Sequence, residues 1–129
     1  MECGKCTWFI PDAFYPETDV GSYVSHEAVC VLNTGDKDAN ILITLYFENK
    51  EPVSGFKAIC GARRTNHIRM DKIVSEDGKK VERGVPYAML VESDVPVVVQ
   101  YSRLDTTQAE MSFMGLLAYW AIIFLLLSD

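Results

Sequence analysis

The feature that most constrains the fold is a series of short apolar runs, each ended by a turn signal, from about residue 8 to residue 105. The run SHEAVCVLN stops at the polar loop NTGDKDAN, and ILITLYFEN stops at KEPVSG. Strand-length runs separated by Gly, Pro, Asn and Asp are typical of all-β sandwiches and barrels. The pattern therefore predicts an all-β fold, a single-domain antiparallel β-sandwich with a jelly-roll-like arrangement.

Two later segments extend this pattern. The stretch FKAICGARRTNHIRM is long enough for two short strands, and Gly61 between them tolerates the backbone angles of a hinge. After the polar loop SEDGKKVERG, the runs YAMLVES and VPVVVQYSRLD predict two more strands around DVP. Pro96 would then stand at a strand start, where its missing N–H costs least.

The chain is 129 residues long, the size of one domain, and its 49% apolar and 23% charged residues are typical of a globular protein. We expect one domain over residues 1–129, with the sandwich at about residues 5–120 and an apolar tail at residues 121–129. The start MECGKCTWFI lacks the pattern of a secretory signal, which predicts a cytoplasmic protein with reduced thiols. The net charge of -6 argues against a general affinity for nucleic acid.

The C-terminal part of the sequence is strongly apolar, because residues 111–127 carry no charge. This segment lies at the lower length limit for a membrane-spanning helix, and no Lys or Arg flanks it. We therefore expect a closing strand followed by an apolar tail, and we predict that residues 121–127 do not span a membrane. Asp105 and Gln108 would also suit the cap of a helix that begins near Thr106, so helix and strand both stay open here.

Cysteine and histidine patterns give only weak signals for metal or redox chemistry. CGKC is a C-x-x-C pair, but no βαβ pattern follows it, and Cys30 and Cys60 are expected to be small core residues. His26 and Glu27 are adjacent, so in a regular strand they face opposite sides and cannot both bind one ion with His67. The sequence contains no nucleophile elbow and no phosphate-binding glycine loop. We expect no metal, no cofactor and no catalytic residue.

The segment ARRTNHIRM, residues 62–70, concentrates three arginines and one of the two histidines of an acidic chain. Side chains alternate along a strand, so four donors would share one face. These four residues form the arginine row: Arg63, Thr65, His67 and Arg69. We predict that the arginine row lines a polar cleft near a subunit boundary.

Arg103 and Asp105 repeat the combination of an arginine with a polar neighbour. The planar fork of arginine suits carboxylates, phosphates and vicinal hydroxyls, and Asp105 would accept from a hydroxyl or orient an arginine. Two interpretations stay open for these residues and the arginine row: a ligand site, and ordinary ion pairing within or between subunits. Buried arginines need partners, so in a cleft they must meet Glu27, Asp105, an anionic ligand or water.

Three blocks together resemble the sensory rhodopsin transducer family: SHEAVCVLNTGDKDANILITLYFENKEPV, ARRTNHIR and VPVVVQYSRLDTTQAE. The resemblance implies a small all-β sandwich that assembles as a homotetramer. It also implies a superfamily proposed to bind sugars or related small molecules, with a membrane photoreceptor as a specialised partner. The family's motif positions fall on His26, Glu27, Asn33, Arg63, Arg64, Thr65, His67, Arg69, Gln100, Arg103 and Asp105. The last nine residues, AIIFLLLSD, have no counterpart in the family.

We therefore expect a non-enzymatic, homo-oligomeric module that binds a sugar or a sugar acid. The expected ligand-binding residues are Glu27, Arg63, Thr65, His67, Arg69, Tyr101, Arg103 and Asp105. One aromatic ring would cover the apolar face of the ligand: Trp8, Tyr87 or Tyr101. The alternative is a cytoplasmic transducer that docks on a seven-helix photoreceptor and, in one version, acts on DNA. A third hypothesis is an enzyme that acts on a sugar-like substrate, which requires His67 to be a general base.

Overall fold

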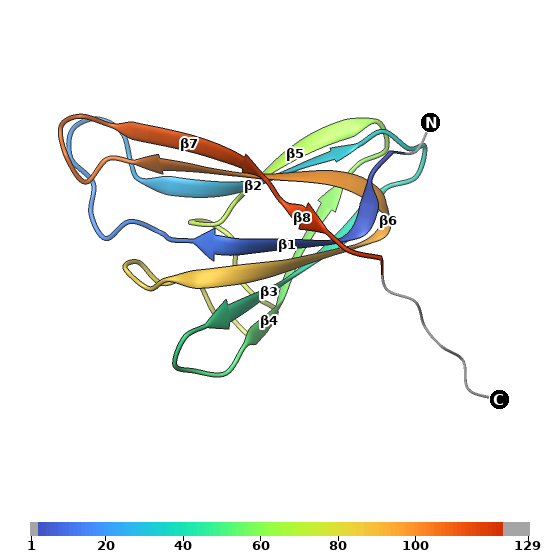
Figure 1. Cartoon of the computed structure of the whole chain (residues 1–129), viewed down its shortest axis with the longest axis horizontal. Coiled ribbons are helices and arrows are strands. Elements are labelled where there is room, and N and C mark those ends of the chain that lie inside the picture. Colours follow the sequence, from blue (N-terminus) through green and yellow to red (C-terminus); the bar gives the residue numbers. More distant parts are fainter. Residues whose placement is uncertain (1–2, 123–129) are drawn as a thin grey trace.

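The computed structural model describes residues 3–122, and in this part of the chain every regular element is a β-strand (Figure 1). The strands are β1 (Lys5–Ala13), β2 (His26–Asn33), β3 (Ala39–Phe47), β4 (Val53–Cys60), β5 (Arg64–Arg69), β6 (Tyr87–Asp105), β7 (Ser112–Leu117) and β8 (Tyr119–Trp120). All of their pairings are antiparallel. The prediction of an all-β antiparallel domain is confirmed.

The long strand β6 organises the whole fold. Its first half pairs with β1 and β3, and its second half pairs with β2 and β7. Figure 1 shows β6 turning back at one end of the molecule, so that β2 and β7 lie above β1. Hydrogen bonding joins all eight strands in one sheet that is continuous through β6. The finer prediction of a jelly-roll-like sandwich therefore stays a prediction.

One prediction about this region is wrong, because YAMLVES and VPVVVQYSRLD form a single strand of 19 residues and not two. Side chains satisfy backbone groups around the bend at Pro96. The Ser93 hydroxyl accepts from Val95 N–H at 3.3 Å, and the Asp94 carboxylate accepts from Asn40 N–H at 2.8 Å. Pro96 lies in a gap of the register, because β1 pairs with Glu92 and Val97 but not between them, so its missing N–H falls where this ladder is interrupted.

The core lies where the two halves of β6 bring their strands together. Alternate residues of β2 and β3 are fully buried, among them Val29, Val31 and Ile43. Phe56 from β4 is buried with them. Cys60 is also buried and confirms its prediction as a core residue, whereas Cys30 is only half-buried. Because side chains alternate along a strand, each strand has one side that faces the core and one that faces away from it. We call these two sides the inner face and the outer face.

The segment ARRTNHIRM forms the hinge and strand that its pattern predicts. Strand β4 ends at Cys60 and β5 begins at Arg64. Arg63 lies in the intervening turn with a φ of 51°, and its N–H donates to the Gly35 carbonyl at 2.9 Å. A left-handed arginine outside the strand does not follow the strand alternation. The prediction that Arg63 shares the strand face of Thr65 therefore does not hold.

The apolar C-terminal segment forms strands β7 and β8, so the closing-strand interpretation is confirmed and a helix from Thr106 is wrong. β7 adds to the second half of β6, and β8 adds to β1. Their outward side chains are strongly exposed, with Phe113 at 69%, Leu117 at 76% and Tyr119 at 72%. Among residues 3–122 no helix is long and apolar enough to cross a membrane. Most of residues 121–127, for which no membrane span is predicted, lies outside the described residues.

Candidate functional site

Glu27 is the most deeply buried charged residue among the predicted site residues, with 1% of its surface exposed. It lies on the inner face of β2, directly opposite Arg103 of β6 in the antiparallel register. The Tyr87 hydroxyl donates to Glu27 Oε1 at 2.6 Å, and the Tyr101 hydroxyl donates to Oε2. Phe14 N–H donates to Oε2 at 2.8 Å. Both oxygens of a buried carboxylate are thus satisfied, as burial requires.

Arg103 completes this group, which we call the acid cluster: Glu27, Tyr87, Tyr101 and Arg103. Arg103 Nε donates to the Tyr101 hydroxyl oxygen at 3.0 Å. Burial raises the pKa of Glu27, although the hydrogen bonds from Tyr101 and Tyr87 oppose that rise. Burial, together with the nearby Glu27 charge, also raises the pKa of Tyr87 and Tyr101, which keeps both hydroxyls protonated as donors. The acid cluster therefore ties together both halves of β6, β2 and the end of β1.

Thr65, His67 and Arg69 lie on the other side of the sheet, the outer face. The register places Thr65 opposite Leu32, His67 opposite Cys30, and Arg69 opposite Ala28, all on β2. Thr65 and His67 are exposed, and Arg69 is half-buried. Among the described residues β5 pairs with β2 alone, so the arginine row stands on an edge strand. Its place in a cleft near a subunit boundary stays a prediction.

Arg69 pairs with a carboxylate that the sequence pattern did not predict. Its Nε and Nη2 donate to the two oxygens of Asp71 at 2.7 and 2.8 Å, so the pair is bidentate. Burial acts to raise the pKa of Asp71, but the hydrogen bonds and charge of Arg69 outweigh burial and hold that pKa below its ordinary value. The expected partners were Glu27 and Asp105. Glu27 cannot serve because it lies on the inner face.

A second arginine–carboxylate pair stands near the first. Arg83 Nη2 donates to both oxygens of Asp19 at 3.2 and 3.0 Å, and Arg83 Nη1 donates to the Glu17 carbonyl. The N–H of Ser25 donates to Asp19 at 2.7 Å and, with Arg83, lowers the Asp19 pKa. Arg83 also lies 4.5 Å from the ring centre of Tyr15. These contacts hold the irregular segment at residues 14–25 against the strand ends.

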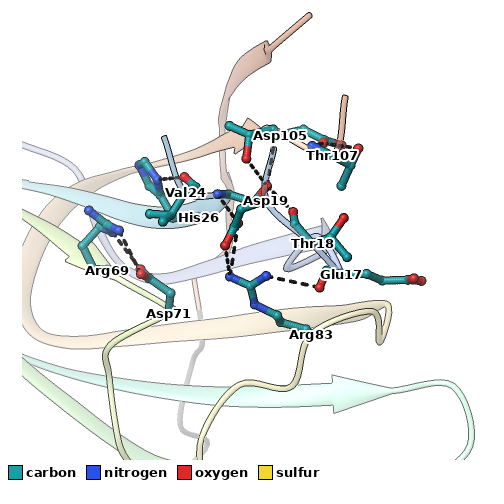
Figure 2. A network of polar contacts seen from close by, with 12 residues as sticks. Glu17, Thr18, Asp19, Val24, His26, Arg69, Asp71, Arg83, Asp105 and Thr107 are labelled. Atoms are coloured by element: carbon teal, nitrogen blue, oxygen red, sulfur yellow. Dashed lines mark hydrogen bonds and ion pairs between the residues drawn. The ribbon is translucent and has the colours of Figure 1, made fainter. Parts of the chain in front are cut away.

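Figure 2 shows that the two pairs lie around His26, at the end of the sheet where β2 begins and β5 ends. We call this group the ion cluster: Asp19, His26, Arg69, Asp71 and Arg83. His26 Nδ1 lies 3.0 Å from the Val24 carbonyl. Asp105, drawn in the same view, accepts from the N–H and hydroxyl of Thr107 at 2.9 and 2.6 Å.

The structure therefore divides the predicted site residues into two groups. Glu27, Tyr101 and Arg103 meet in the acid cluster, whereas Arg69 joins the ion cluster on the outer face. Asp105 lies near the ion cluster but bonds locally, and Arg63 lies in a turn. The residues expected to cover a ligand ring are all buried in the core: Trp8, Tyr87 and Tyr101. Tyr87 also lines a hollow on the surface, and a role for one of these rings over a ligand stays a prediction.

Three residues of the ion cluster were missed: Asp19, Asp71 and Arg83. The sequence could have predicted Asp71, because it follows Arg69 by two residues and shares the same face when the chain stays extended. It could not have predicted Asp19 and Arg83, since both lie in irregular segments 64 residues apart. Within residues 3–122 no group of three or more His, Cys, Asp or Glu side chains is placed to hold a metal ion.

The fold and the site define an all-β antiparallel domain with one buried acid cluster and one outer ion cluster. Residues 3–120 match the family model described as Anabaena sensory rhodopsin transducer. The chain belongs to this family, and the resemblance read from its sequence blocks is confirmed.

Two solved structures are similar to this chain. The crystal structure of Thermotoga maritima 1070 has a TM-score of 0.82 and 37% identity, covering 92% of this chain and 96% of that chain. The Anabaena sensory rhodopsin transducer has a TM-score of 0.70 and 36% identity, covering 78% of this chain and 98% of that chain. No curated protein sequence matches the chain.

Proposed function

We propose that the chain is a cytoplasmic, non-enzymatic transducer module that binds a sugar or a sugar acid at the ion cluster. The observation that carries this proposal is the pair of arginines, Arg69 and Arg83, each fixed by a carboxylate at one end of the sheet. Arg69 uses Nε and Nη2 on Asp71, which leaves Nη1 to donate to a ligand. Side chains fixed before binding lose little entropy when the ligand arrives.

The chemistry of the ion cluster suits a ligand with hydroxyls and a carboxylate. Guanidinium groups donate to a carboxylate, whereas Asp19 and Asp71 accept from hydroxyls. Asp105 would add a further acceptor, since its hydrogen bonds from Thr107 both go to Oδ1. Thr65 and His67 would extend the site along the outer face of β5. Glu27, Tyr101 and Arg103 would serve as supports from the inner face, since Glu27 and Tyr101 are fully buried.

A thermal-shift screen of sugars and sugar acids tests this proposal. A ligand that binds only the folded chain stabilises it by mass action and so raises the melting temperature. At a ligand concentration of one hundred times the Kd, the free energy of unfolding rises by about 2.7 kcal/mol. We expect sugar acids to raise the melting temperature more than the matching neutral sugars, because the ion cluster offers two arginines. A screen in which no sugar acid shifts the melting temperature at millimolar concentration would remove the sugar-binding proposal.

A second candidate function, docking on a protein partner, is favoured by the exposed apolar strip on β7 and β8. The strip consists of Phe113, Leu116, Leu117, Tyr119 and Trp120, which are between 46% and 76% exposed. It includes side chains from both faces of β7, because Leu116 lies opposite Tyr101 and Leu117 opposite Gln100 in the register. Exposed apolar patches of this kind mark protein interfaces. The name of the Anabaena relative suggests a membrane photoreceptor as partner, and the family resemblance suggests other copies of the chain. The net charge of -6 gives no support to DNA as the partner.

We expect the native chain to form a homo-oligomer, a tetramer by resemblance, through the apolar strip. Leu117→Asp should lower the mass measured by light scattering, because a charge placed in an apolar interface loses its hydration. Val74→Asp is the matched control, since Val74 is 44% exposed and lies outside the strip. A native chain that is monomeric at micromolar concentration, or a Leu117→Asp chain that assembles like the native one, would contradict the strip as the subunit interface.

A further inference from the structure

A groove runs over the outer face of the sheet along the first half of β6. The strands beneath it are β1, β6 and β3, which lie side by side (Figure 1). It consists of two adjoining hollows of about 430 and 370 Å³ that share Pro11, Tyr46 and Ala88. Phe9 lines the first hollow, and Asp12 and Glu48 line the second. The groove is thus apolar along its length and acidic at one end.

Strand geometry explains the shape of the groove. Tyr46 lies opposite Ala88 in the register of β3 and β6, and the small Ala88 side chain leaves a low floor. Phe9 and Tyr46, which are 37% and 44% exposed, stand on the strands to either side. Strands two apart in a sheet are about 10 Å apart, and four strand residues extend about 13 Å. The groove is therefore wide enough for one extended chain and long enough for about four of its residues.

The charges at the acidic end of the groove indicate which charge its ligand carries. Asp12 has 75% of its side chain exposed even though Arg103 reaches it at 3.4 Å. Glu48 is exposed beside it. Two cations reach this end: Arg103, at Asp12, and Lys50, which lies over the Phe47 ring and pairs with Glu82 at 3.4 Å. The three carboxylates Asp12, Glu48 and Glu82 therefore outnumber the cations by one. Negative potential at this end favours a ligand that carries Lys or Arg.

We propose that this groove binds a proline-rich peptide segment in the polyproline II conformation, with a Lys or Arg next to the prolines. Polyproline II chains rise about 3.1 Å per residue, so about four residues match the length of the groove. Such chains dock on aromatic-lined grooves and need no strand partner. A peptide that adds a β-strand would need an open sheet edge, whereas β6 is paired on both sides here. The proposal goes beyond the sugar-binding function, which uses the ion cluster where β2 begins and β5 ends.

The test is an NMR titration of the full chain, labelled with ¹⁵N, with a synthetic peptide in which a run of prolines precedes two arginines. We expect amide shifts confined to the groove strands around Phe9, Tyr46 and Ala88. Tyr46→Ala should weaken binding by about tenfold or more, about 1.4 kcal/mol, because one aromatic wall is lost. Tyr23→Ala is the matched control, since Tyr23 is 61% exposed and lies outside the groove. Glu48→Gln should weaken binding and reduce its dependence on salt.

Four results would overturn the proposal. These are no shifts at millimolar peptide, shifts centred outside the groove, equal binding by a peptide with glycine in place of proline, and unchanged binding by Tyr46→Ala. Shifts in the groove with neutral sugars and none with the peptide would also overturn it, because the groove would then be a small-molecule site.

Discussion

Replacing Glu27 with alanine is expected to lower the free energy of unfolding by about 3–5 kcal/mol, the usual cost of breaking a buried charged hydrogen-bond group. The hydroxyls of Tyr87 and Tyr101 lose their acceptor in this variant, and Phe14 N–H keeps only its longer contact with the Tyr101 hydroxyl at 3.3 Å. Both hydroxyls are in the core, where an unsatisfied donor keeps its full desolvation cost. Arg103 also loses the carboxylate opposite it in the register.

Chemical denaturation of the native chain and of Glu27→Ala measures this loss. Glu110→Ala is the control, since Glu110 is exposed and should change stability by less than about 0.5 kcal/mol. Glu27→Gln keeps the shape and one acceptor, so its loss should fall between the two. A Glu27→Ala chain within about 1 kcal/mol of the native chain would show that the acid cluster contributes little to stability.

The pH dependence of stability carries a second signature of Glu27. Burial raises its pKa above the ordinary value of 4.5, so the native state holds this proton more tightly than the unfolded chain. The contribution of Glu27 is therefore largest below that value and is lost as the pH rises through the raised pKa. Asp71 acts in the opposite direction, because its lowered pKa stabilises the fold above its ordinary value. The stability advantage of the native chain over Glu27→Gln should thus shrink as the pH rises.

Local patterns in the sequence predicted the strands but not where the strands meet. Alternation placed Glu27 and Arg103 in strands, yet their contact depends on the register between β2 and β6, which is a property of the topology. Alternation also placed Thr65, His67 and Arg69 on one face correctly, because β5 is regular there. It did not apply to Arg63, whose φ of 51° belongs to a turn.

Proline and apolar composition were the two misleading signals. Pro96 predicted a strand start, but it lies in a gap of the pairing between β6 and β1, where β6 continues without needing its N–H. The uncharged C-terminal segment predicted a closing strand but did not exclude a helix from Thr106, and pairing with the edges of β6 and β1 accounts for strands β7 and β8. Irregular segments gave no signal, so the Asp19–Arg83 pair of the ion cluster could not be predicted.

Arg69→Ala is expected to abolish most of the sugar-acid response while leaving the assembly unchanged. A charged hydrogen bond to a ligand contributes about 1.5–3 kcal/mol, so its removal should weaken binding by about ten- to a hundredfold. The variant also leaves Asp71, only 10% exposed, without its bidentate partner, which should cost about 1–3 kcal/mol of stability. Arg69→Lys separates charge from shape, because lysine keeps the charge and loses the planar fork.

A loss of both assembly and stability in Arg69→Ala, by about 3–5 kcal/mol, would instead mean that the arginine serves a buried subunit contact. An Arg69→Ala chain with native assembly, stability and ligand response would mean that the row is only a solvated surface.

The most direct measurement is calorimetric titration of the sugar acid that gives the largest thermal shift into the native chain, Arg69→Ala and Arg64→Ala. Arg64 is the matched control, since it is exposed on the same strand and its Nη1 donates only to the neighbouring Arg63 carbonyl among the described residues. We expect saturable binding by the native chain and by Arg64→Ala, and binding at least about tenfold weaker by Arg69→Ala. Equal binding by all three chains, or no binding by the native chain, would contradict a ligand site at the ion cluster.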